Sequence, residues 1–228
     1  KRQTQDNSTF YYTPAANEWR NFIGGDGMEC LIHPDDPETI YGSYQYGTII
    51  ATNDGGFSTW WANSDISEAG EWTTPFQMHP DDPDILYAGY GNVYQTVDEG
   101  FSWFPISNFP DVLALGQPSP ASALAVAPSN PNYIYAASRV YHSFNEPMTF
   151  WRTTNGGATW QNVTLGLPDS LYITYIAVDE TDENVVWASC GGFIDGVKVF
   201  KSEDAGDTWQ NISSVSYTHL TLPTMMSV

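Results

Sequence analysis

A short motif that recurs four times constrains the fold of this chain more than any other feature. The copies are TNDGGFST from Thr52, TVDEGFSW from Thr96, TTNGGATW from Thr153 and SEDAGDTW from Ser202. They share Ser/Thr, Asp/Asn, Gly, Ser/Thr and an aromatic residue at fixed spacing, except that Trp60 stands one position late in the first copy. Self-similarity at a fixed period is typical of chains built from stacked structural repeats.

A second motif precedes each copy of the first. Its copies are HPDDPETIYGSY, HPDDPDILYAGY, APSNPNYIYAAS and DETDENVVWASC. They place Tyr41, Tyr87, Tyr135 and Trp187 at equivalent positions, 46 to 52 residues apart. Two independent series that keep the same order indicate a true repeat.

Each repeat predicts four short strands. The first is an apolar segment, and a Pro/Asp/Asn turn leads to the second, an aromatic segment with small residues. The third strand runs into the motif, and the fourth leaves it. The β-branched and aromatic residues favour strands over helices. Four strands in about 40–50 residues are typical of a β-propeller blade.

The predicted fold is therefore all-β, an open arc of four complete blades and part of another. We expect a partial blade at 1–23 and full blades at about 24–69, 70–110, 120–166 and 170–214. In the partial blade, residues 9–22 would form two strands. A generic β-sandwich is the alternative, but it does not explain two motif series in phase.

The acidic residues of the motif raise the question of a metal or catalytic site. A Ca²⁺ loop needs about 6–8 oxygen ligands, whereas the shared positions supply one carboxylate, and the third copy has Asn155 there. Glu203 and Asp207 are not repeated in the other copies. We therefore predict no metal site and interpret the motif as a hairpin turn. Asp or Asn would accept amide hydrogen bonds, Gly would permit positive φ, and the aromatic residue would cover the turn.

This pattern resembles the Asp-box, or BNR repeat, of sialidases, sortilin-type receptors and xyloglucan-degrading glycoside hydrolases. The resemblance covers about residues 1–214 and implies a fold element on a hairpin away from the functional face. The structural residues that it implies are Thr52, Asp54, Gly56, Ser58, Thr96, Asp98, Gly100, Trp103, Thr153, Asn155, Gly157, Trp160, Ser202, Asp204, Gly206 and Trp209.

Function is expected on the opposite face, in the loops between strands two and three and between blades, because ligands often bind loops on a rigid scaffold. The ligand-binding candidates there are Asp26, Glu29, Tyr44, Gln45, Tyr46, Trp72, Tyr90, Tyr141, Glu146, Phe193 and Asp195. The same loops hold Glu71, His142 and Phe144. Aromatic faces beside carboxylates suit sugar rings or a peptide. Alternatively, these side chains only pack their own loops.

Two functional hypotheses follow. The N-terminal half resembles large secreted bacterial proteins with sortilin-type repeats, many of which carry a type IX secretion sorting domain. This resemblance favours a non-catalytic secreted module that binds or scaffolds glycan or protein ligands. The alternative is a xyloglucanase-like glycoside hydrolase whose carboxylates lie partly outside this chain. Against the hydrolase, Gln45 stands where the resemblance implies a catalytic Asp, and a neutral amide cannot act as acid or base.

Further functional classes are disfavoured. A sialidase-like site needs three arginines, but Arg2, Arg20, Arg139 and Arg152 are not at equivalent blade positions. An assembly factor similar to the photosystem stability propellers is a minor alternative. Two of the loop carboxylates within about 5–10 Å of each other would favour a hydrolase.

The composition excludes some classes of binding partner. The net charge of −20, with only seven Lys and Arg, argues against nucleic acid and anionic membranes, which attract clustered positive charge. No apolar run is long enough for a membrane span, and we expect no cofactor. A secreted or cell-surface location fits this acidic composition. Cys30 and Cys190 are predicted to be buried, and the oligomeric state is left open.

The end of the chain differs from the rest. VSYTHLTLPT at 215–224 resembles a translated sequencing adapter from assembled environmental DNA. We therefore expect residues 215–228 to be a non-native, disordered tail on a propeller fragment.

Overall fold

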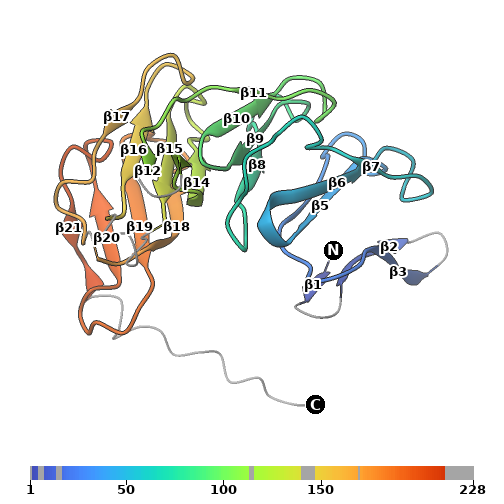
Figure 1. The fold of residues 1–228 in the computed structure, drawn as a ribbon, viewed down its shortest axis with the longest axis horizontal. Coiled ribbons are helices and arrows are strands. Elements are labelled where there is room, and N and C mark those ends of the chain that lie inside the picture. The colour runs from blue at the N-terminus through green and yellow to red at the C-terminus, as the bar shows by residue number, and fades with distance from the viewer. Residues whose placement is uncertain are drawn as a thin grey trace.

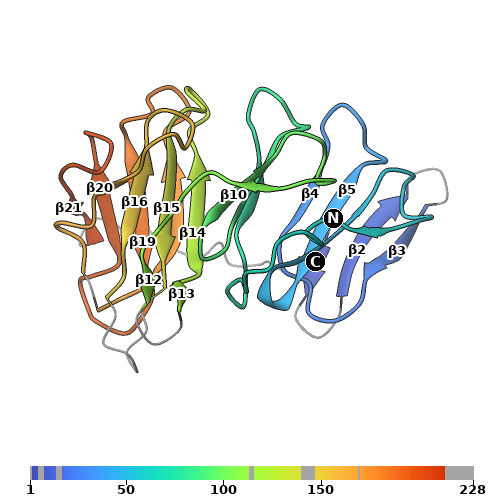
Figure 2. The ribbon, with the colours of Figure 1, turned by 45° about the horizontal axis from the view of Figure 1, so that its top comes forward.

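The computed structural model describes residues 2–4, 8–13, 17–112, 116–139, 147–168 and 170–213. The segments at 140–146 and 214–228, with the expected tail, lie outside this description. Antiparallel sheets stand side by side and follow one another around an open arc (Figure 1). The arc runs from the N-terminal sheet to β18–β21, with the sheets fanned about a common side (Figure 2). The predicted all-β propeller architecture is confirmed.

Five sheets of the arc are called the first to fifth blades. The first blade is β1 (Arg2–Thr4), β2 (Ser8–Thr13) and β3 (Glu18–Ile23). The second is β4 (Cys30–Ile32), β5 (Ile40–Tyr44), β6 (Thr48–Thr52) and β7 (Trp60–Trp61), with the 3₁₀ turn η1 (Gln45–Gly47) between β5 and β6. The third is β8 (Phe76–Met78), β9 (Leu86–Gly89), β10 (Val93–Thr96) and β11 (Phe104–Pro105). The fourth is β14 (Ala121–Val126), β15 (Ile134–Ser138), β16 (Phe150–Thr153) and β17 (Gln161–Asn162). The fifth is β18 (Ile173–Val178), β19 (Val186–Cys190), β20 (Val199–Ser202) and β21 (Gln210–Asn211).

Two details differ from the expected strands. The first blade has a third strand, because β1 pairs with β2 through Arg2 and Phe10. The segment expected as a loop before the fourth blade contains a small hairpin of β12 (Asp111–Val112) and β13 (Gln117–Pro118). Both features are too short to show an apolar alternation in the sequence, so pattern reasoning missed them.

The core lies between the blades. Tyr41, Tyr87 and Tyr135, at equivalent positions of the second strands, are 0%, 3% and 0% exposed. Each packs against apolar side chains of the following blade, as Tyr135 does against Val186 and Ala188. Small residues at the interfaces allow neighbouring sheets to approach closely, and burial of apolar surface between sheets stabilises the arc. Both cysteines are buried, as predicted.

The four repeat turns share one hydrogen-bond pattern. In the second blade the Thr52 hydroxyl donates to Asp54 Oδ1 (2.8 Å), and the amides of Phe57 and Ser58 donate to the same oxygen (both 2.9 Å). The amide of Gly56 donates to Thr52 Oγ1 (2.9 Å), and the Ser58 hydroxyl donates to Asp54 Oδ2 (2.6 Å). Because hydrogen bonds from Ser58 and Thr52 favour the carboxylate, the pKa of Asp54 is lowered to about 2.

The third turn makes the same pattern with a neutral side chain. Asn155 Oδ1 accepts from the amide of Thr159 (2.9 Å) and from the Thr153 hydroxyl (2.9 Å). Asn155 Nδ2 donates to Thr159 Oγ1 (2.9 Å), so the hydroxyl accepts where Ser58 donates. The turn therefore needs a side-chain oxygen two residues after the first hydroxyl residue, with or without a charge.

The motif tryptophans do more than cover their own turns. The indole N–H of Trp160 donates to the carbonyl of Ile106 (2.7 Å), and that of Trp209 donates to the carbonyl of Val163 (3.0 Å). The indole of Trp103 donates in the same way to Ala62. Each acceptor is the residue that follows the last strand of the preceding blade. The tryptophan thus joins two blades, a contact that the sequence pattern did not reveal.

Candidate functional site

A groove of about 700 Å³ lies along the first strands of four blades. Leu31 of β4, Phe76 and Gln77 of β8, residues 122–124 of β14 and residues 173–176 of β18 line it. First strands lie on the concave side of the arc (Figure 1), so the curvature of the arc brings residues distant in sequence to one groove. A volume of this size is within the range of small-molecule and cofactor sites, about 300–1,000 Å³.

An ion pair stands at the edge of this groove. Glu71, before β8, accepts hydrogen bonds at Oε1 from Arg139 Nη1 and from the amide of Trp72 (2.8 Å). Arg139 follows β15, so the pair joins the third blade to the fourth. The second oxygen of Glu71, Oε2, is buried and has no hydrogen-bond partner among the described residues. The edge of the groove thus presents a half-exposed guanidinium that is held by a largely buried carboxylate.

Exposed aromatic side chains line the same groove. Trp72, Tyr172 and Tyr175 are 41%, 46% and 66% exposed. Tyr46 lies against Trp72 edge to face, with ring centroids 5.3 Å apart. Exposed rings on a folded scaffold offer rigid apolar surface to a ligand at low entropic cost.

The sequence candidates are placed in three groups. Glu29 and Trp72 line the groove, and Tyr46 lies beside Trp72. Tyr44 is partly buried at the end of β5, and Phe193 and Asp195 are exposed on the loop between β19 and β20, outside the groove lining. Tyr141 and Glu146, with His142 and Phe144, lie outside the described residues.

Asp26 and Gln45 form a pair of their own. Gln45 Nε2 donates to Asp26 Oδ2 (2.6 Å), and Asp26 is buried. Gln45 is the position at which the resemblance implied a catalytic Asp. In this chain the Gln45 amide instead donates a hydrogen bond to the carboxylate of Asp26, in the loop before β4. The pair therefore ties two loops of the second blade together.

The prediction of Tyr90 as a ligand-binding residue is corrected by its burial in the structure. Its side chain is 1% exposed, and its hydroxyl donates to the carbonyl of Gly47 and accepts from Asn63 Nδ2 (3.1 Å). Burial raises the pKa of its phenol above the usual value. The aromatic ring binds the second blade to the third, so it is unavailable to a ligand in solution.

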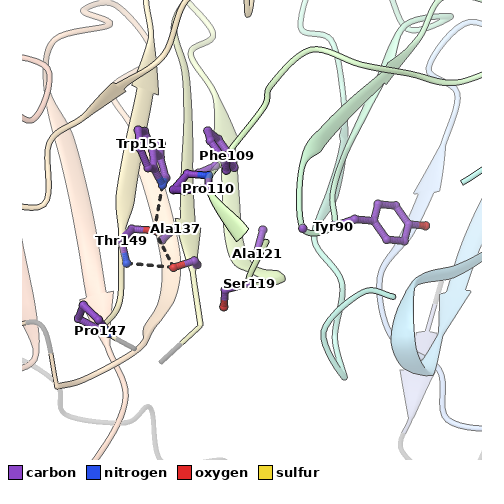
Figure 3. A pocket seen from close by; sticks show the side chains of 12 residues that line it. Tyr90, Phe109, Pro110, Ser119, Ala121, Ala137, Pro147, Thr149 and Trp151 are labelled. Carbon is purple, nitrogen blue, oxygen red and sulfur yellow. Dashed lines mark hydrogen bonds between the residues drawn. The ribbon is translucent and has the colours of Figure 1, made fainter. Parts of the chain in front are cut away.

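A smaller pocket of about 160 Å³ lies between the third and fourth blades, and the ring of Tyr90 points away from it (Figure 3). Phe109 stacks on Trp151 at one wall, with centroids 4.9 Å apart. Thr149 Oγ1 is hydrogen-bonded to Ser138 Oγ (2.8 Å) and accepts from Trp151 Nε1 (2.9 Å). The polar atoms of this wall already form hydrogen bonds with one another, so we interpret the pocket as part of the interface between the third and fourth blades.

Sequence reasoning did not predict Arg139, Tyr172 or Tyr175 as groove residues. Arg139 begins a loop of the expected binding face but was considered only as part of a sialidase-like site, whereas Tyr172 and Tyr175 lie outside the loops expected on that face. A signal was present for Tyr175: it is equivalent to Pro75, Ala123 and Glu29 in the other first strands, and Glu29 was already a candidate. Among the described residues no group of three or more His, Cys, Asp or Glu is placed to hold a metal ion. Within the same part of the chain, no helix has the length and apolar character needed to cross a membrane.

No protein-family model and no curated protein matches this chain. Solved structures do. An ancestral GH74 enzyme has a TM-score of 0.62 at 18% identity, covering 83% of this chain and 24% of that one. The GH74 xyloglucanase of Xanthomonas campestris has a TM-score of 0.66 at 15% identity, covering 91% and 36%. The GH74 enzyme of Niastella koreensis has a TM-score of 0.57 at 12% identity, covering 91% and 42%. The chain thus spans less than half the length of these structures, and the likeness shows a shared fold.

Proposed function

We propose that this chain is a glycan-binding propeller module and that the groove along the first strands is its binding site. The observation that carries the proposal is the grouping of Trp72, Tyr172 and Tyr175 with the Glu71–Arg139 pair around one groove. Similarity in fold to a xyloglucanase supports a polysaccharide ligand.

The chemistry of a sugar fits this lining. A pyranose ring has apolar C–H faces, which pack on aromatic rings, and a rim of hydroxyl groups. Glu71 is largely buried and holds Arg139 at the edge of the groove. Arg139 supplies donors for ring or hydroxyl oxygens. The groove therefore offers both kinds of contact that a neutral glycan needs.

A hydrolase is the second candidate, because Glu29 and Glu71 both line the groove. Glycoside hydrolysis needs an acid and a base or nucleophile about 5–10 Å apart across the scissile bond. Three observations support binding without hydrolysis: Glu71 is ion-paired to Arg139, Asp26 is hydrogen-bonded to Gln45, and Gln45 itself cannot transfer a proton.

Calorimetric titration with xyloglucan oligosaccharides and with cello-oligosaccharides tests the binding proposal. We expect affinity for at least one series, and a loss of tenfold or more in Trp72→Ala and in Tyr172→Ala. Phe57→Ala is the matched control, because Phe57 is 84% exposed on a repeat turn, outside the groove lining. Undiminished binding by both groove variants would contradict the assignment of the site.

Release of reducing ends from the same glycans separates the two candidates. A binding module produces none above a buffer blank. If release is found, and Glu29→Gln and Glu71→Gln abolish it while they retain binding, the hydrolase is correct. We also propose a secreted or cell-surface location, which fits the acidic composition and a polysaccharide ligand; fractionation of the source cells tests it.

A further inference from the structure

The part of the groove formed by the second and third blades is strongly acidic. Residues 21–138, which include both blades, contain no Lys or Arg but hold more than half of the 27 Asp and Glu residues of the chain. Among the described residues that line the groove, Arg139 is the one Lys or Arg, and it is already ion-paired with Glu71. The charge of Arg139 is therefore compensated, and the negative charge of Glu29 determines the sign of the lining.

Glu29 is the carboxylate of the lining that has no ion-pair partner in the described part of the chain. It is exposed, and its carbonyl accepts from the amide of Ser43 (2.8 Å), so its backbone is held on the sheet of the second blade. The Thr73 hydroxyl donates to Sδ of Met28 (3.4 Å), which precedes Glu29 in the chain. This contact brings the segment that carries Trp72 beside Glu29. An exposed carboxylate and an exposed indole therefore lie at the same end of the groove.

Glu29 also belongs to a row of equivalent positions along the groove. The residues at this position of the four first strands are Glu29, Pro75, Ala123 and Tyr175, and all of them line the groove. The first strands follow one another along the concave side of the arc (Figure 1). A ligand that lies along this row meets a carboxylate at one end, the short side chains of Pro75 and Ala123 in the middle, and an aromatic ring at the other end.

Carboxylates and aromatic rings together recognise ammonium groups. A cation over the face of Trp or Tyr is attracted by the quadrupole of the ring. A carboxylate adds a charge-assisted hydrogen bond, and a negatively charged cleft raises the local concentration of cationic ligands. A sugar that carries a carboxylate meets the opposite situation, because Glu29 repels it and Arg139 is already paired.

We propose that the groove prefers glycans that carry ammonium groups, such as glucosamine polymers, and that Glu29 determines this preference. The inference rests on the proposed function, since it specifies the class of glycan that the same groove binds. Trp72 and the two tyrosines supply apolar faces to any pyranose, with or without an amino group. The contact between the ammonium group and Glu29 is what distinguishes the two classes of sugar.

Calorimetric titration of the full chain with two matched oligosaccharides tests this preference. Cello-oligosaccharides and fully deacetylated chito-oligosaccharides share the same backbone linkage and differ in the hydroxyl or ammonium group on the second carbon of each sugar. In a mildly acidic buffer that protonates the amines, the chito-oligosaccharide should bind more tightly by roughly three- to thirtyfold at low ionic strength. The ratio of the two affinities should fall as salt is added, because salt screens exposed charges.

Two charge-removing variants locate the source of the preference. Glu29→Gln should bring the ratio of the two affinities close to one. Glu180→Gln removes an equal charge from an exposed turn between β18 and β19, outside the groove lining, and should leave the ratio unchanged. Both ligands are titrated into the same preparation, so a partial loss of folded protein affects the two measurements alike.

The outcomes separate this inference from the proposed function. Equal affinities of the wild type for the two oligosaccharides would overturn the preference and leave glycan binding intact. A preference that persists in both Glu29→Gln and Trp72→Ala would also refute it, because the net charge of the whole chain would then be its source. Absence of binding to any glycan would reject both proposals.

Discussion

The indole N–H of Trp209 donates to the backbone carbonyl of Val163 at 3.0 Å, and this bond links the turn of the fifth blade to the end of the fourth. Val163 also donates its own amide to Phe150 of β16, so its peptide group is held on the fourth blade. The repeat motif therefore contributes to the propeller in two ways. Its hydroxyl, carboxylate and glycine form the turn, and its tryptophan fixes the distance between blades.

Trp160→Phe should lower the free energy of unfolding by about 1 kcal/mol or somewhat more, because it removes the hydrogen bond to the carbonyl of Ile106. Urea denaturation followed by far-UV circular dichroism measures the change. Trp60→Phe is the matched control. The displaced Trp60 stacks on Phe101 with a centroid distance of 5.0 Å, but its buried Nε1 has no partner among the described residues.

Trp60→Phe removes the same atoms without breaking a hydrogen bond, and it also removes a buried donor that is not satisfied. The loss in the free energy of unfolding should therefore be clearly smaller for Trp60→Phe than for Trp160→Phe, or absent. Equal losses in the two variants would show that ring volume, and not the bond between blades, explains the conserved spacing of the motif within this chain.

The sequence predicted the repeat turn well because its interactions are local. The oxygen of Asp54 and the amide of Ser58 are four residues apart, and such spacing is visible in the sequence. The partner of Trp160 is Ile106, which is distant in the chain and belongs to another blade. A contact of this kind depends on how sheets stack, which a repeating pattern implies only in outline.

Lowering the pH should reduce the free energy of unfolding of the wild type more than that of the Asp54→Asn variant. The folded pKa of Asp54, lowered to about 2 by hydrogen bonds from Ser58 and Thr52, lies below an unfolded value of about 3.9. A depressed folded pKa contributes stability that is complete above the unfolded pKa and is lost as the pH falls toward the folded one. The contribution should thus disappear between about pH 4 and pH 2.

Urea midpoints of wild type and Asp54→Asn, measured from pH 7 to pH 2, check this prediction. Their difference should shrink in acid, while other carboxylates titrate equally in both proteins. Asn155→Asp is the reverse test: it places a carboxylate in the third turn and should add acid sensitivity. A difference between wild type and Asp54→Asn that is independent of pH would contradict the role of the charge.

Gly157→Ala should destabilise the chain by roughly 2 kcal/mol or more, from two causes. The φ of Gly157 is +94°, which costs about 1–2 kcal/mol for a residue with a side chain. A Cβ there would also lie 2.8 Å from the Cβ of Ile106 on the preceding blade, and overpacking adds about 1–3 kcal/mol. Gly196→Ala is the control, because Gly196 has φ +68° and open space around its Cβ position. Melting temperatures that fall equally in both variants would rule out the contact with Ile106 as a cause of the destabilisation.

The groove was harder to foresee than the blades. The sequence directed attention to loops on one face, and it found Glu29 and Trp72 there. Tyr172 and Tyr175 reach the same groove from the fifth blade, because the sheets curve around a common side. The alternation of a strand indicates which side chains share a face of one sheet, but it does not give the curvature that brings separate sheets to one groove.

Tyr90→Phe distinguishes a structural from a ligand-binding role for this tyrosine. The variant loses the hydrogen bond to the carbonyl of Gly47 and the one from Asn63 Nδ2, so the free energy of unfolding should fall by about 1–2 kcal/mol. Because the ring is buried, affinity for any glycan that binds the groove should stay within about twofold, since interface residues without ligand contact contribute little. Denaturation and calorimetric titration on the same preparation give both values. A variant of unchanged stability that has lost glycan affinity would return Tyr90 to the binding face, whereas the reverse pattern identifies it as a contact between the second and third blades.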